Sequence, residues 1–236
     1  MSRHIGIVAV SPEGSAICYR RIFHAATRLA GAAGKAGHHP RVTLHNEPFE
    51  AYLSAVLKDD WHTVGDLLRR SAEILAKAGA EFCIVPDNLM QHGVHLAEVG
   101  SPIPWLKMTD LVADAISADG RKKVGLIGTR MVMLGSTYQT PLGMRGVHVL
   151  VPPEDQASEV DAIIFRELVH GVISPASQHR VLDIINGLAG QGCEGIILGC
   201  TEAPLLVSAE NSPIPVYDSV GLLAEGAARR ALGMTA

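Results

Sequence analysis

Aromatic residues and long apolar runs are scarce in this sequence of 236 residues. Only 4% are Phe, Trp or Tyr whereas 47% are hydrophobic, so we expect a core of Ala, Val, Ile and Leu. Apolar runs such as 83–86 and 195–198 have the length of a strand and are far too short to cross a membrane. The first residues lead into an apolar segment, 5–10, without a signal-peptide pattern. We therefore expect a cytoplasmic protein with no membrane partner.

Excess positive charge and the common cofactor motifs are also missing. The formal net charge is −4 and no Lys/Arg-rich block occurs, which gives no electrostatic basis for a nucleic-acid partner. The dinucleotide pattern G-x-G-x-x-G and the P-loop are absent. No lysine lies in a context that indicates pyridoxal phosphate. The sequence therefore predicts that no cofactor is used.

The few cysteines exclude further classes of protein. Cys18, Cys83, Cys193 and Cys200 form no C-x-x-C pair and no zinc spacing with histidine, so no metal site is expected. A disulfide framework is not typical of so long and apolar a chain, and reduced thiols are predicted. We interpret the first three cysteines as structural and treat Cys200 as a functional candidate.

Short apolar runs alternate with segments of helical period, which is typical of a parallel sheet flanked by helices. Strands are predicted at 5–10, 41–45, 82–86, 104–107, 123–128, 147–151, 195–198 and 216–218. Helices are predicted at 16–31, 61–78, 111–118, 133–142, 158–168, 178–190 and 221–232. The fold class is therefore α/β.

A sequence pattern that occurs twice predicts two pseudo-symmetric lobes. Residues 81–88 and 195–202 are each an apolar strand that ends at a small or rigid residue, and 5–10 resembles 124–129. We expect an N-terminal lobe of 1–106 with 216–236 and a C-terminal lobe of 107–215, with the active site in the cleft between them. A single doubly wound sheet is the alternative. Ligands of open parallel sheets bind at the carboxyl ends of strands.

Two strand ends carry groups that can transfer protons. Cys200 follows Gly199, and a helix beginning at Ala203-Pro204 would lower the pKa of an exposed thiol there. Aligned on the strands, Asp87 lies opposite Cys200 and Asn88 opposite Thr201. A buried structural cysteine and a plain turn at Asp87-Asn88 are the alternatives. The pairing favours a catalytic role for Cys200 and Asp87.

Small polar residues after other strands are candidates for binding an anionic substrate. Ser11 and Pro12 follow the first strand and open the first helix, where backbone N–H groups attract anions, although a plain N-cap gives the same pattern. Thr129 and nearby Tyr138 are assigned the same role in the second lobe. Asn46 is a candidate near the distal end of the substrate. Asn88, Thr201 and Glu202 complete the predicted set.

The sequence resembles the aspartate/glutamate racemase superfamily over nearly its whole length, and Gly-Cys-Thr-Glu is the most specific of the matching motifs. These motifs are Gly6-Ile7-Val8 with Ser11-Pro12-Glu13, Val85-Pro86-Asp87-Asn88, Gly125-Leu126-Ile127-Gly128-Thr129, Ser136-Thr137-Tyr138-Gln139, Gly199-Cys200-Thr201-Glu202 with Pro204-Leu205, and Pro215-Val216-Tyr217-Asp218-Ser219. The resemblance implies two α/β lobes, a homodimer, a small carboxylate substrate and catalysis without a cofactor. It also implies a cysteine from each lobe exchanging a proton at the substrate's α-carbon.

The sequence departs from the family at the first cysteine, because Asp87 stands there and Leu89 replaces the threonine after Asn88. A buried carboxylate with a raised pKa could replace the thiol as acid or base. The resemblance therefore implies an isomerase, a racemase or epimerase of an acidic amino acid or related carboxylate that uses Cys200 with Asp87. The alternatives are a one-cysteine decarboxylase or cis–trans isomerase of a dicarboxylate, and a catalytically silent carboxylate-binding homologue.

Overall fold

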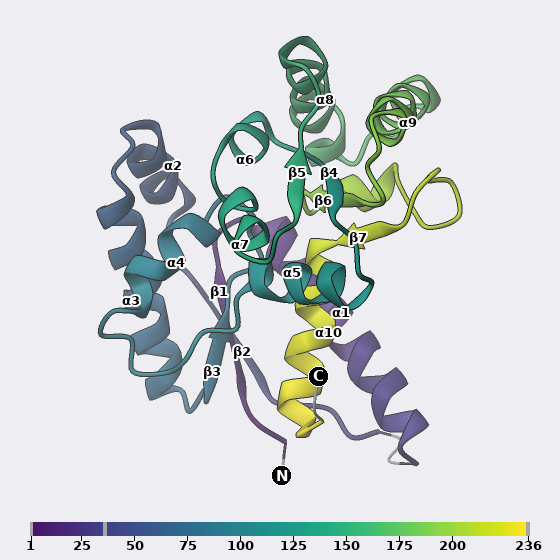
Figure 1. Cartoon of the computed structure of the whole chain (residues 1–236). Coiled ribbons are helices and arrows are strands. Elements are labelled where there is room, and N and C mark those ends of the chain that lie inside the picture. Colours follow the sequence, from purple (N-terminus) through teal and green to yellow (C-terminus); the bar gives the residue numbers. More distant parts are fainter. Residues whose placement is uncertain (1, 35–36, 235–236) are drawn as a thin grey trace. The chain divides into compact units, whose positions relative to one another are not determined.

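The computed structural model describes residues 2–34 and 37–234 and divides into two compact units. Unit 1 comprises Met1–Met108 and Val220–Ala236, and unit 2 comprises Thr109–Ser219. Each unit contains its own parallel sheet flanked by helices, which confirms the predicted two-lobed α/β fold (Figure 1). Among the described residues, no helix has both the length and the apolarity that crossing a membrane requires.

The sheet of unit 1 has three parallel strands in the order β2-β1-β3. In its register Ile7 pairs with Leu44 on one side and with Ile84 on the other. Helices α1 and α10 lie on one side of this sheet, and α3 and α4 on the other (Figure 1). The bounds are β1 Ile5–Ala9, α1 Pro12–Ala32, β2 Val42–Asn46, α2 Phe49–Leu57, α3 Trp61–Lys77, β3 Phe82–Ile84, α4 Gln91–Glu98 and α10 Ser219–Leu232.

Both faces of β1 are buried, which explains why its sequence is continuously apolar. Val8 and Val10 pack into a cluster with residues of α2, α3 and α4. On α1, Ala25 and Ala26 form a second cluster with Ala228 of α10. Because these side chains are small, the two helices pack closely.

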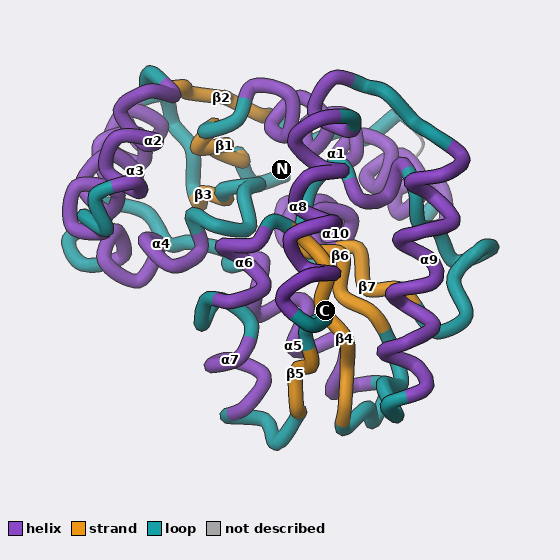
Figure 2. Tube along the Cα trace, turned by 90° about the horizontal axis from the view of Figure 1, so that it is seen from above, coloured by secondary structure: helices purple, strands orange, loops and turns teal. Residues whose placement is uncertain are grey.

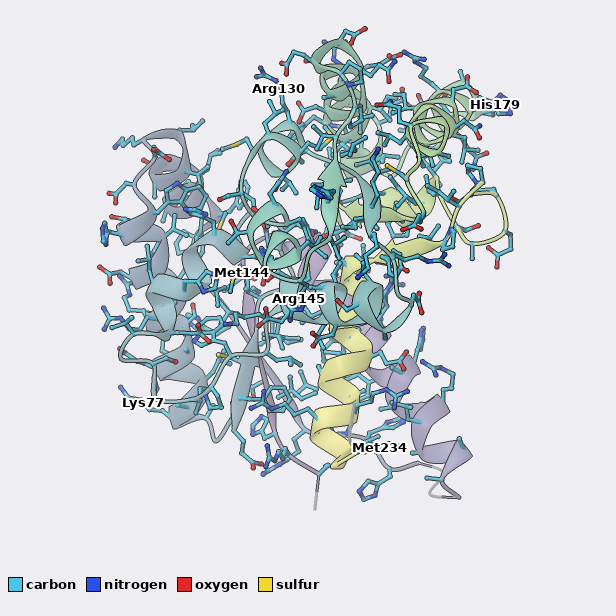
Figure 3. All side chains as sticks on the ribbon, viewed as in Figure 1. Lys77, Arg130, Met144, Arg145, His179 and Met234 are labelled. Carbon is cyan, nitrogen blue, oxygen red and sulfur yellow. The ribbon has the colours of Figure 1, made fainter. Side chains whose placement is uncertain are left out.

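The sheet of unit 2 has four parallel strands in the order β5-β4-β6-β7, which lie side by side in Figure 2. Helices α8 and α9 contact β4, and Arg145 (labelled in Figure 3) follows α7 and pairs with Asp114 of α5 at 2.8 Å. The bounds are α5 Met108–Ala118, β4 Lys123–Gly128, α6 Arg130–Leu134, α7 Gln139–Gly143, β5 His148–Leu150, α8 Glu154–Arg166, η1 Leu168–His170, α9 Pro175–Gly190, β6 Ile196–Gly199, η2 Ala203–Leu205 and β7 Val216–Asp218.

Three predicted elements require correction. The strand at 216–218 pairs with β6, so it belongs to unit 2 and not to the N-terminal lobe. The segment 104–107 forms only an isolated bridge, Cys83 with Trp105, because Pro104 has no N–H to extend a ladder. The single helix predicted at 133–142 is two short helices, since the extended Gly135 ends α6.

Helices α2 and α4 were not predicted. In α2, Tyr52, Ala55 and Val56 are buried while Phe49, Leu53 and Leu57 are exposed. An apolar residue on every face removes the amphipathic pattern by which a helix is recognised. Helix α4 has only eight residues and contains Gly93, which weakens its helical signal.

A close approach of two backbones ends both central strands of unit 2. Gly128 of β4 is the register partner of Gly199 of β6. A Cβ atom on Gly128 would lie 2.6 Å from the Gly199 carbonyl oxygen, and backbone cannot move aside as a flexible side chain can. The pair therefore requires glycine, and it fixes the positions from which Thr129 and Cys200 continue.

We expect Gly128→Ala to destabilise the protein by about 1–3 kcal/mol or more, because the added methyl group forces β4 and β6 apart. Gly187→Ala is the matched control, since Gly187 lies inside α9 with nothing within 4 Å of an added Cβ. That change should stabilise the protein by roughly 0.5–1 kcal/mol. Urea unfolding of both variants measures the difference. Equal stabilities for the two variants would contradict the steric argument.

Candidate functional site

Cys200 follows β6 directly, at the carboxyl edge of the sheet of unit 2. Its side chain is 6% exposed, and Sγ donates a hydrogen bond to Glu202 Oε2 at 3.0 Å. The strand-end position was predicted, but the expected exposure of the thiol is wrong. Glu202, which was predicted to bind substrate, accepts a hydrogen bond from the thiol.

The environment of Cys200 keeps its proton on sulfur. Burial, and then the negative charge and hydrogen bond of Glu202, raise the pKa of the thiol well above its usual range. The backbone N–H groups of Glu202 and Ala203 act in the opposite direction but do not compensate. The predicted net lowering of the pKa by a following helix is therefore wrong, because burial and Glu202 outweigh the N–H groups of this turn. Cys200 rests as a neutral thiol.

Thr129 follows β4 directly, as Cys200 follows the neighbouring β6, since Gly128 and Gly199 are register partners. It is the N-cap of α6, yet its side chain makes no capping hydrogen bond. Asp161 of α8 takes that role and accepts from the backbone N–H of Arg130 at 2.7 Å. The Arg130 side chain (labelled in Figure 3) bonds Glu154 through Nε at 2.6 Å. The carboxyl edge of this sheet therefore presents Thr129, Cys200 and the half-buried Thr201.

Tyr138 occupies a different environment from the one predicted. Its side chain is completely buried. This burial is the main reason that the pKa of the phenol lies well above its usual range. Ser219 hydrogen-bonds it and also donates to the Leu198 carbonyl oxygen at 2.7 Å. Tyr138 therefore supports β6 from within the core. The prediction that it contacts substrate conflicts with this burial.

Asp87 lies beyond the end of β3, at the carboxyl edge of the sheet of unit 1. It is half-buried, and Oδ1 accepts hydrogen bonds from the backbone N–H groups of Leu89 at 3.0 Å and Met90 at 3.2 Å. This turn was the structural alternative that the sequence left open, and it is present. Donors of this kind stabilise an ionised carboxylate. The turn therefore fixes the carboxylate, but stabilising the ionised form weakens a base, so these bonds do not supply the added basicity that was expected of Asp87.

The remaining predicted residues of unit 1 lie at the same edge. Ser11 caps α1 by accepting from Gly14 N at 3.2 Å, with the exposed Pro12 at the first position of the helix. Asn46 ends β2, and its Nδ2 donates to the Ala9 carbonyl oxygen of β1 at 3.0 Å. Asn88 is 5% exposed. The ends of all three strands thus bring polar groups to one edge, although Ser11 and Asn46 are also structural.

The sequence did not indicate a buried polar group formed by Tyr52, Ser71 and His45. His45 Nδ1 lies 3.0 Å from Ser71 Oγ, and Ser71 and Tyr52 have no exposed surface. The pKa of Tyr52 is raised to about 12, mainly by burial. The hydrogen bond from Ser71 lowers this pKa, whereas the charges of Glu47 and Asp87 raise it further. Tyr52 therefore stays neutral within the electrostatic field of Asp87. The sequence did not indicate Tyr52 because the helix that carries it, α2, was not predicted.

A family model described as Asp/Glu/Hydantoin racemase matches residues 7–227. A crystal structure from Yersinia pestis, of a protein named for the Asp/Glu racemases, is 33% identical, with a TM-score of 0.90 over 98% of this chain and 99% of that one.

Two more distant structures share the fold. An aspartate racemase homologue from Pyrococcus horikoshii is 24% identical, with a TM-score of 0.85 over 98% of this chain and 100% of that one. A glutamate racemase from Francisella tularensis, solved with D-glutamate, is 14% identical, with a TM-score of 0.65 over 95% of this chain and 79% of that one. The family model and the Yersinia pestis structure, and not these two distant likenesses, support a racemase-type function. The chain belongs to the Asp/Glu/hydantoin racemase family.

Proposed function

We propose that the protein is a cofactor-independent racemase or epimerase of an acidic amino acid or a related small carboxylate. Cys200 and Asp87 are the two groups that transfer protons at the α-carbon. The observation that carries the proposal is the Cys200 thiol at the end of β6, hydrogen-bonded to Glu202 at 3.0 Å, in a chain of this family. A homodimer is part of the proposal.

The resting protonation states of the two groups differ in the way that proton exchange requires. The Asp87 carboxylate is stabilised in its ionised form by two backbone N–H groups and accepts the α-proton. The neutral Cys200 thiol donates a proton to the α-carbon, which completes the inversion. In the reverse direction Glu202 takes the proton of Cys200, and the thiolate then removes the α-proton.

Stabilising the carbanion requires hydrogen-bond donors around the substrate's carboxylate. Carbon acids of this kind are very weak, so donors placed where charge develops lower the barrier most. Ser11 and Asn88 supply them in unit 1, and Thr129 and Thr201 in unit 2. All four lie at the carboxyl edge of their own sheet, which supports this assignment.

One observation favours a second candidate, in which Cys200 acts alone. Cys18 and Cys83 have no exposed surface, and Cys193 precedes β6, so among the described residues Cys200 is the one thiol that follows a strand end. A neutral thiol can protonate an enolate that a decarboxylation produces. Alternatively, Cys200 can pass its proton to Glu202 and add as a thiolate to the double bond of a dicarboxylate. The second candidate is therefore a one-cysteine decarboxylase or cis–trans isomerase.

Incubation with both enantiomers of aspartate and glutamate in deuterium oxide tests the main proposal. We expect deuterium at the α-carbon, measured by mass spectrometry, and a loss of racemisation of about 100-fold or more in Cys200→Ser and Asp87→Asn. Cys193→Ser should retain the activity of the natural chain. No exchange with any acidic amino acid would refute the racemase, and turnover of malonates or maleate that depends on Cys200 alone would establish the second candidate. Tight binding without exchange or turnover would indicate a silent homologue.

The proton of Cys200 can be followed by alkylation. Glu202→Gln removes the negative charge and the carboxylate acceptor that raise the pKa of the thiol, so the pKa falls. Each unit of that fall gives roughly tenfold more thiolate well below the pKa. Iodoacetamide at pH 8 should therefore label Cys200 faster in this variant, as measured on the isolated peptide. Cys83, whose pKa is raised mainly by burial, is the internal reference and should not change. Slower labelling of Cys200 would show that Glu202 does not hold its proton.

A further inference from the structure

Gln91 makes three hydrogen bonds around the turn that carries Asp87. It is the first residue of α4, and its side chain is 4% exposed. Its Nε2 donates to the carbonyl oxygens of Val85 at 2.9 Å and Asp87 at 3.2 Å. Its Oε1 accepts from the backbone N–H of Met108 at 3.1 Å. One buried amide thus uses its donor and acceptor atoms together.

The two accepting carbonyl groups lie on either side of Pro86, beyond the last residue of β3. Pro86 lacks the N–H that could pair with a neighbouring strand. The main chain at Asp87 is therefore held by a side chain and not by a sheet ladder. The carboxylate is held in turn by Leu89 N and Met90 N. Together these bonds fix both the backbone and the side chain of Asp87.

The third bond of Gln91 reaches the end of unit 1. Met108 is the first residue of α5 and the last residue of unit 1 before the chain enters unit 2. The backbone N–H groups of the first helical turn have no partner within their own helix. Gln91 supplies a partner for the N–H of Met108. The same side-chain amide therefore holds both the turn of Asp87 and the point where the chain leaves unit 1.

From this geometry we infer that Gln91 is the positioning residue for Asp87 in the proposed reaction. An apolar side chain of similar length would leave the carbonyl groups of Val85 and Asp87 and the N–H of Met108 without this partner. The turn then gains freedom at the residue that must meet the α-proton. A misplacement of about 1 Å costs a catalytic group on the order of 100-fold in rate. The inference rests on the proposed function, because Asp87 must be a working base.

A positioning role makes a directional prediction that a general structural role does not. Asp87 and Cys200 face opposite sides of the α-carbon in the proposed reaction, so each exchanges the α-proton of one enantiomer. Loss of Gln91 should slow only the exchange that depends on Asp87. A loss of overall packing would slow both exchanges together.

The experiment measures α-proton exchange of each enantiomer separately in deuterium oxide, at early times, with the full-length enzyme. Asp87→Asn and Cys200→Ser first identify which enantiomer depends on which group. Gln91→Met should then lower the Asp87-dependent exchange about 10–100-fold and leave the Cys200-dependent exchange within about threefold. Gln191→Met is the control and should change neither exchange, since Gln191 is an exposed residue directly after α9 whose side chain donates to the Gly187 carbonyl oxygen at 3.2 Å.

The variant Gln91→Glu provides a second test that does not rely on an apolar side chain. At low pH the new carboxyl group is protonated and offers one donor and one acceptor, so it can replace part of the amide. When it ionises it offers acceptors only and repels the carbonyl oxygens of Val85 and Asp87. The Asp87-dependent exchange of this variant, relative to that of the natural chain, should therefore fall as the pH rises.

Three results would overturn the inference. One is an equal loss of both exchanges in Gln91→Met, another is no loss of either, and the third is a ratio for Gln91→Glu that does not change with pH. Absence of exchange in the natural chain would overturn the proposed function itself. Because the variants are compared with a natural chain that exchanges both enantiomers, the two failures are distinguished.

Discussion

The close approach of β4 and β6 at Gly128 and Gly199 is the constraint on which the chemistry of unit 2 depends. Because a Cβ atom on Gly128 would lie 2.6 Å from the Gly199 carbonyl oxygen, no larger residue fits without moving a strand. The contact ends both strands at the same level, so Thr129 and Cys200 leave the sheet as neighbours. Cys200 is buried at this position, and burial is the largest cause of the raised pKa of its thiol.

Unit 1 places its candidate residue by different means. Pro86 interrupts the ladder after β3, and the turn of Asp87 is held by the Gln91 amide and by the N–H groups of Leu89 and Met90. A backbone contact that admits only glycine leaves little freedom, whereas a turn held by side-chain hydrogen bonds depends on every partner. The positions of the two candidate groups are therefore fixed in different ways.

The sequence predicted the features that depend on local pattern. Continuous apolar runs located β1, β4 and β6 to within about one residue, because strands buried on both faces have no polar alternation. The strand ends then indicated Asp87 and Cys200 as candidates, and both residues lie beyond the ends of strands. What could not be predicted depends on distant partners: β7 has three residues and belongs to unit 2 only through its pairing with β6. The burial of Tyr138 likewise depends on packing. The bond between Cys200 and Glu202 joins residues only two apart, but it depends on the conformation of the chain after β6. The burial of Tyr52 was not predicted because α2 was not predicted.

In the proposed reaction, pairing an aspartate with a cysteine determines which group holds a proton before substrate binds. Two thiols of similar pKa could each begin as donor or acceptor, but a carboxylate held by two N–H groups and a thiol bonded to Glu202 begin in opposite states. The resting enzyme is then prepared for the enantiomer whose α-proton faces Asp87. The reverse reaction must first move the proton of Cys200 to Glu202 and protonate Asp87. Under the proposed function, an aspartate at position 87 therefore biases the order of proton transfers without changing the equilibrium between enantiomers.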